Sequence, residues 1–222
     1  MSGKLQGCGS VLLFALYRRI RKTEFSLMSS GWSDLTSAER RAFGLVSLGY
    51  VLLFLWSRNF PFFADGVVQS SMAGQFFVDN GFGSFFLPED RSPGHPPFWG
   101  MYLSVWWFVL GKHLWVAHLA CLPFLILALY QFLWVGRFWV KPPFLPILLV
   151  LFLFEPTWLA QATQVLPDLA MMALFFLGLR GILYDRTWML ILAACCLPLL
   201  NTRGTMLVAV SGSSSRANLY PH

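Results

Sequence analysis

Long apolar runs constrain the fold of this chain more than any other feature of its sequence. Residues 114–136 contain no Asp, Glu, Lys or Arg, and comparable apolar runs occupy residues 42–56 and 144–162. A helix needs about 20 apolar residues to cross a bilayer. Only 12% of the whole chain is charged, whereas a soluble domain carries about 25% charged residues. The sequence therefore predicts an all-α, polytopic transmembrane helical bundle.

We expect about five spans together with interfacial helices. The predicted spans are residues 42–56 (with apolar residues continuing to 63), 114–136, 144–162, 169–183 and 188–200. Residues 98–111 are apolar but too short to cross a bilayer, so they are predicted to form an interfacial or re-entrant helix. Residues 66–78 are predicted to form a short amphipathic helix.

This pattern divides the chain into three regions. Residues 1–41 form a basic leader, in which Thr36-Ser37-Ala38-Glu39 reads as a capping box at a helix start. Residues 42–210 form the transmembrane region, with an external loop at 57–113. Residues 211–222 are a polar tail without a fold signal.

The distribution of Lys and Arg predicts the orientation. The leader holds seven of these residues, so its end of the first span should be cytoplasmic. If residues 98–111 crossed the membrane, Arg137 and Lys141 would lie outside and Asp168 inside. If they stay at the outer surface, the basic pair is cytoplasmic and Asp168 is external. The second layout matches both length and charge, and it is the one we predict.

The net charge of +6 does not indicate nucleic-acid binding. The basic residues are grouped at the ends of apolar runs, where they act as orientation signals and attract anionic lipid. The four cysteines, Cys8, Cys121, Cys195 and Cys196, lack metal-ligand spacing and are interpreted as small packing residues. Membrane lipids are the expected environment, with no nucleic acid among the partners.

Two carboxylates are the main candidates for chemistry. Asp65 directly follows an apolar span, where a charge needs a partner or a function. It could equally cap the helix predicted at 66–78. Asp168 follows Pro167 at the start of a span, where a negative charge suits the first helical turn. That structural role could be its whole purpose.

Three further polar residues lie near the predicted outer span ends. Glu155 either lines the same cavity as the two carboxylates Asp65 and Asp168 or marks the edge of the membrane. His95 precedes Pro96-Pro97, which open the interfacial helix, and is either a loop residue or a ligand. Arg203 could hold a phosphate through paired hydrogen bonds or extend to lipid head groups.

The order and spacing of these motifs resemble a known family. The pattern consists of Asp65 after an outward span, His95-Pro96-Pro97 opening a surface helix, Leu166-Pro167-Asp168, and Thr202-Arg203. It resembles the N-terminal part of a GT-C fold membrane glycosyltransferase of family 39. That family includes the dolichyl-phosphate-mannose protein mannosyltransferase-like and the lipid A aminoarabinose transferase-like enzymes. The resemblance covers roughly residues 42–210.

The resemblance implies transfer of a sugar from a polyprenyl-phosphate donor to a lipid, glycan or protein acceptor outside the cytoplasm, in a bacterial inner or plasma membrane. It implies that Asp65 is the catalytic base and Asp168 a second catalytic carboxylate. Arg203 would stabilise the departing lipid phosphate, while His95 and Glu155 would contact substrate. No cofactor is expected, and whether a divalent metal is needed stays open.

Two alternatives remain beside the glycosyltransferase. Members of that family are usually much longer, so we expect this chain to be truncated or frameshifted. It could then be an inactive remnant or an assembly subunit of the same fold. The other alternative is a transporter, because intramembrane carboxylates also couple ions. No internal repeat of the kind found in transporters is visible in the sequence.

Overall fold

The computed structural model describes residues 32–92, 94–202 and 204–205. The chain divides into two compact units, Met1–Ser37 and Ala38–His222. In the described part of the first unit, a 3-10 helix covers Trp32–Asp34. Residues 1–31 of the predicted leader lie outside the described residues, as do Cys8 and the tail at 211–222.

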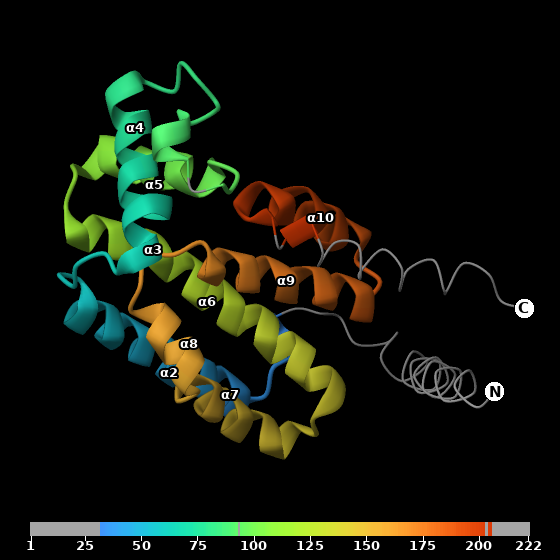
Figure 1. Cartoon of the computed structure of the whole chain (residues 1–222). Helices are drawn as coiled ribbons and strands as arrows, with labels where there is room; N and C mark the ends of the chain where they lie inside the picture. Colours follow the sequence, from blue (N-terminus) through green and yellow to red (C-terminus); the bar gives the residue numbers. More distant parts are fainter. Residues whose placement is uncertain (1–31, 93, 203, 206–222) are drawn as a thin grey trace, which may run out of the picture. The chain divides into compact units, whose positions relative to one another are not determined.

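The described residues of the second unit form helices joined by turns and loops, and they contain no β-strand. This confirms the predicted all-α class. In chain order its elements are α2 (Ser37–Ser57), α3 (Ala64–Gly66), a π-helix (Val67–Met72), α4 (Ala73–Asn80), a 3-10 helix (Glu89–Arg91), α5 (Phe98–Leu110), α6 (Leu114–Trp139), a 3-10 helix (Pro142–Phe144), α7 (Leu145–Leu153), α8 (Pro156–Ala162), α9 (Asp168–Leu183) and α10 (Thr187–Leu200) (Figure 1).

Most of the predicted helices are present in the structure, with ends that differ by a few residues from the prediction. Helix α2 begins at Ser37, as the Thr36 signal predicts. The amphipathic helix is longer than expected, because α3, the π-helix and α4 follow one another from Ala64 to Asn80. The predicted interfacial segment is α5, whose 13 residues extend for only about 20 Å. It is indeed too short to cross a bilayer.

The predicted span at 144–162 is not one straight helix. It is divided into a stretch at 142–153 and a second at 156–162, and the two are bent by 58°. The cause lies in Phe154-Glu155-Pro156. Proline has no N–H to donate and disfavours a helical conformation in the residue before it, and Glu155 is extended, with φ −64° and ψ 120°.

Helix α6 has 26 residues and no charged residue before Arg137 near its end. It is the one described helix that is long and apolar enough to cross a membrane, or one of two if the bent pair forms a single span. The predicted number of five spans therefore stays a prediction.

Helix α9 packs against α6 on one side and α10 on the other (Figure 1). Small residues permit the close contact between α9 and α10. A Cβ atom at Gly181 would lie 2.9 Å from the backbone nitrogen of Leu190, and one at Gly178 would lie 3.1 Å from the Cβ of Ala193. Such small residues are typical of helices that pack closely in membranes.

Helices α4 and α5 form a second tight pair. A Cβ atom at Gly100 would lie 2.6 Å from the Cβ of Ala73, so α5 lies directly against the start of α4. The Tyr102 hydroxyl joins α5 to α6 by donating to the Ala120 carbonyl at 2.8 Å. Burial raises the pKa of Tyr102 to about 12, so this hydroxyl keeps its proton at neutral pH.

Buried charges join three helices at one end of the second unit. Nε of Arg137, near the end of α6, lies 3.3 Å from the Glu39 carboxylate in the first turn of α2. Their side chains are only 6% and 0% exposed. On α9, Arg180 donates to the Gln131 side chain at 3.0 Å. Both guanidinium groups lie over the Trp134 ring, at 5.2 and 4.7 Å from its centre.

Candidate functional site

The opposite end of the second unit brings together segments far apart in the sequence. There α2 ends and both α6 and α9 begin. A ring nitrogen of His118 on α6 lies 3.1 Å from the Phe60 carbonyl oxygen, just after α2. The Thr202 hydroxyl, just after α10, lies 3.5 Å from Nδ1 of His95. The segments that carry Asp65, His95 and Asp168 lie at this end, while the predicted location of these residues and Arg203 at the outer membrane surface stays a prediction.

Asp65 is exposed in the one-turn helix α3. The N-cap residue of this helix is Phe63, so the alternative that Asp65 caps the helix is wrong. Ala64 has a φ of 27°, a conformation that a residue with a side chain rarely adopts. Such strain persists only where the surrounding structure imposes it, and it is concentrated at functional sites.

A hydrogen-bonded relay attaches the segment of Asp65 to the loop before α9. The hydroxyl of Ser70, in the π-helix, donates to the Val165 carbonyl and accepts from the indole N–H of Trp99 at 2.9 Å. Ser70 is completely buried. A Cβ atom at Gly66 would lie 3.5 Å from the same Val165 oxygen, so the two segments are in direct contact.

The relay predicts a measurable loss of stability in Ser70→Ala. The Trp99 N–H and the Val165 carbonyl would lose their shared partner, which costs about 1–3 kcal/mol for buried groups. Denaturant titration of the purified protein in detergent measures this loss. Ser84→Ala is the matched control, because the Ser84 hydroxyl bonds the Phe86 carbonyl at an exposed position. Equal stability of the two variants would contradict a structural role for the relay.

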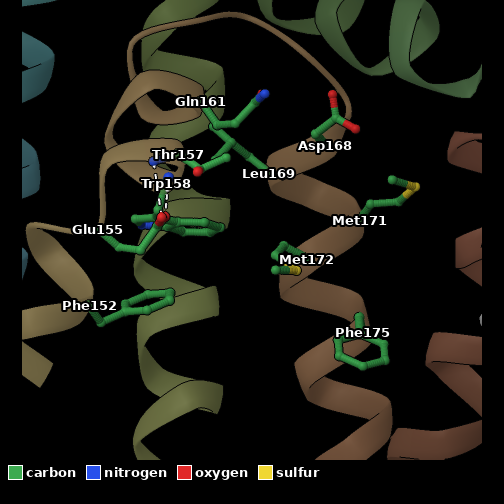
Figure 2. A pocket seen from close by; sticks show the side chains of 10 residues that line it. All are labelled: Phe152, Glu155, Thr157, Trp158, Gln161, Asp168, Leu169, Met171, Met172 and Phe175. Atoms are coloured by element: carbon green, nitrogen blue, oxygen red, sulfur yellow. Dashed lines mark hydrogen bonds between the residues drawn. The ribbon is translucent and has the colours of Figure 1, made fainter. Parts of the chain in front are cut away.

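A pocket of about 450 Å³ opens between α8 and α9 (Figure 2). It brings together two of the predicted residues, Glu155 and Asp168. Asp65 and His95 are not among the residues that line it. The lining consists of Phe152, Glu155, Thr157, Trp158, Gln161, Asp168, Leu169, Met171, Met172 and Phe175.

Glu155 has a structural task in this pocket. Its carboxylate accepts the backbone N–H of Thr157 at 3.2 Å and that of Trp158 at 2.5 Å, as the dashed lines in Figure 2 show. It is therefore the N-cap of α8, a role that stabilises a helix by about 1 kcal/mol. The predicted contact between Glu155 and substrate remains a prediction, but capping alone accounts for its position.

Asp168 occupies the position that the sequence predicted, as the first residue of α9. It is half-buried and lies at the same end of the pocket as Gln161 of α8 in Figure 2. Within the described part of the chain, the buried Oε1 of Gln161 has no hydrogen-bond partner. Sequence reasoning did not select Gln161 or Thr157, because a lone amide or hydroxyl in an apolar run carries no motif.

The lining has two different chemical parts. Asp168, Gln161 and Thr157 offer polar groups near one end, and aromatic and thioether side chains such as Phe175 and Met172 cover the rest. Pockets that combine few polar groups with an apolar wall bind ligands with both characters. This pocket therefore suits an amphipathic molecule with a hydroxyl-bearing or otherwise polar head.

The other candidates lie outside this pocket. His95 is half-buried in the segment before α5, which Pro97 precedes as N-cap, and its described contact is with Thr202. Arg203 lies outside the described residues. Among the residues that the structure describes, no group of three or more His, Cys, Asp or Glu side chains could hold a metal ion.

Comparison with protein-family models, with curated proteins and with solved structures yields no match to this chain. The likeness to GT-C glycosyltransferases thus depends on the sequence motifs described above.

Proposed function

We propose that this chain is an integral membrane protein. The support is the amount of apolar surface that the described helices leave open to their surroundings. On α2, Leu45, Leu48 and Leu52 are 67%, 53% and 57% exposed, and on α7 Ile147 and Leu151 are 57% and 62% exposed. Water-soluble proteins rarely expose continuous apolar faces of this kind, whereas lipid solvates them.

In this proposal the unit has about five spans, formed by α2, α6, the bent pair α7–α8, α9 and α10, with α5 at the interface. Arg137 lies in the last turn of α6, Lys141 follows that helix, and Arg186 follows α9. The positive-inside tendency then puts the end of the unit that holds these basic residues, together with the N-terminus, on the cytoplasmic side of a bacterial inner or plasma membrane. The end with Asp65 and Asp168 faces outward.

The proposed activity is transfer of a sugar from a polyprenyl-phosphate donor to an acceptor outside the cytoplasm. One observation supports it. The amphipathic pocket between α8 and α9 has the Asp168 carboxylate at its polar end, and it adjoins the loop before α9, to which Ser70 attaches the segment of Asp65. Such a pocket suits a donor that combines a sugar with a long apolar chain.

The chemistry assigned to Asp65 is general base catalysis. Its carboxylate takes the proton of an acceptor hydroxyl while the hydroxyl oxygen bonds to the anomeric carbon. The bond from that carbon to the phosphate oxygen breaks, and the lipid phosphate leaves with the electron pair. The sugar configuration is inverted. Asp168 orients the sugar through its hydroxyls, and Arg203 is proposed to pair with the departing phosphate.

A reconstituted assay tests this function. Purified protein in liposomes receives a radiolabelled prenyl-phosphate sugar and a membrane fraction as the source of acceptors. Appearance of label in a lipid, glycan or protein acceptor is the expected result. Donor that binds but is never consumed would instead indicate a non-enzymatic remnant or assembly subunit.

The broken helix favours a transporter as the second candidate. A bent span with a carboxylate at its break, as at Glu155, is a feature of transporter binding sites. Because that carboxylate is engaged as a cap, we rank this candidate lower. Uptake of labelled sugar into the same liposomes, without formation of a new glycoside, would establish it.

A further inference from the structure

A second pocket lies between the end of α2 and the start of α6. Its volume is about 440 Å³, and it is lined by Phe54, Arg58, Asn59, Trp115 and Leu119. It shares no lining residue with the α8–α9 pocket. We propose that this second pocket binds the phosphate group of an amphipathic lipid, with the Arg58 guanidinium as the main ligand.

The protein holds Arg58 and Asn59 in a defined place. The chain turns directly after α2, where the Phe60 N–H donates to the Ser57 carbonyl at 2.8 Å. The Phe60 carbonyl in turn lies 3.1 Å from a ring nitrogen of His118, a buried residue of α6. The turn that carries Arg58 is therefore closed onto the end of α2 by the Phe60 N–H and attached to α6 by the Phe60 carbonyl.

The polar side of the pocket suits an anion. Arg58 and Asn59 both supply N–H donors, and none of the five lining residues is acidic. A guanidinium presents paired N–H groups in a plane, which match two phosphate oxygens at once. A phosphate at this position would receive donors from two adjacent residues of one turn.

The remaining walls suit a hydrocarbon chain. Phe54, Trp115 and Leu119 line the pocket from two helices, and Phe54 lies one helical turn before Arg58. An acyl or prenyl chain attached to the phosphate could thus lie against these three side chains. A free phosphate ion would leave these walls in contact with water, which disfavours it as the occupant.

The surrounding side chains place the pocket at head-group level. Trp56 and Phe63 are 68% and 69% exposed on either side of the turn, and the ring of His113 stacks on Trp115 at 6.3 Å. Exposed aromatic side chains gather where the bilayer meets water. This step depends on the proposed membrane location but not on the proposed sugar transfer.

Native mass spectrometry of the detergent-purified full chain tests the proposal. Phosphatidylglycerol is titrated into the wild type, Arg58→Gln and Arg41→Gln. Arg41 is the matched control, because it is an exposed arginine of the same helix α2 near its other end. We expect Arg58→Gln to weaken lipid binding by about 10-fold or more, as loss of a charged hydrogen-bond donor does, and Arg41→Gln to change it less than twofold.

Two further titrations separate the sources of phosphate. Diacylglycerol, which lacks the phosphate, should bind wild type and Arg58→Gln equally. Inorganic phosphate should compete only weakly. Equal loss of lipid binding in Arg58→Gln and Arg41→Gln would overturn the proposal, and so would unchanged binding in Arg58→Gln. Strong, Arg58-dependent binding of inorganic phosphate alone would reassign the pocket to a soluble anion. These measurements contain no sugar donor, so failure of the transfer assay would leave their outcome unaffected.

Discussion

Replacing Asp65 by Asn is expected to lower sugar transfer by about 10²–10⁴-fold, which is the usual contribution of a general base. The amide keeps the size of the carboxylate but accepts no proton at neutral pH. Because Asp65 is exposed, the substitution should leave the stability of the fold unchanged. Initial rates of label transfer in liposomes, compared at equal protein content, measure the effect.

Asp79→Asn is the control for this substitution. Asp79 is an exposed carboxylate near the end of α4, where it accepts from the Gln75 side chain. It should retain nearly all transfer activity. If Asp65→Asn were as active as Asp79→Asn while Asp168→Asn lost activity, the base would have to be Asp168, and the role proposed for Asp65 would be wrong.

Replacing Arg137 by Ala is expected to destabilise the protein by about 3–5 kcal/mol. The substitution leaves the Glu39 carboxylate, which is completely buried, without the guanidinium that lies 3.3 Å away. Removing one member of a buried ion pair costs far more than removing both. Unfolding by denaturant in a fixed detergent measures the free energy. Arg41→Ala removes an exposed arginine and should change it by less than about 0.5 kcal/mol.

A double-mutant cycle distinguishes the ion pair from general damage to packing. Glu39→Gln combined with Arg137→Met removes both charges and retains side-chain volume. We expect the double variant to be more stable than the sum of the two single losses predicts, because neither charge remains unpaired. Strict additivity would mean that Glu39 and Arg137 do not interact.

The sequence predicted the helices well because their signals are local. The lengths of α6 and α5 follow from apolar runs, and the starts of α2 and α9 follow from Thr36 and Pro167-Asp168. The break at Glu155 also had a local signal in the following Pro156. It was overlooked because the run is apolar on both sides, and hydropathy averaged over a span does not register one proline.

The contacts between helices were only partly predictable. Charge counting predicted that Arg137 lies at the cytoplasmic end, yet it did not identify Glu39 as a partner, since a capping box already explained that residue. The candidate site shows the same limit. Span lengths brought the segments of Asp65 and Asp168 to one end, but Gln161 and the Ser70 relay depend on side-chain positions that no spacing rule contains.

The buried charges at one end also restrict how the molecule can move. Helices α2 and α6 are joined there by Glu39 and Arg137, and Arg180 of α9 shares the Trp134 ring with Arg137. Separating these groups would expose them to the cost of unpaired burial. Any change of shape that keeps these contacts has to leave the start of α2 and the last turns of α6 and α9 together.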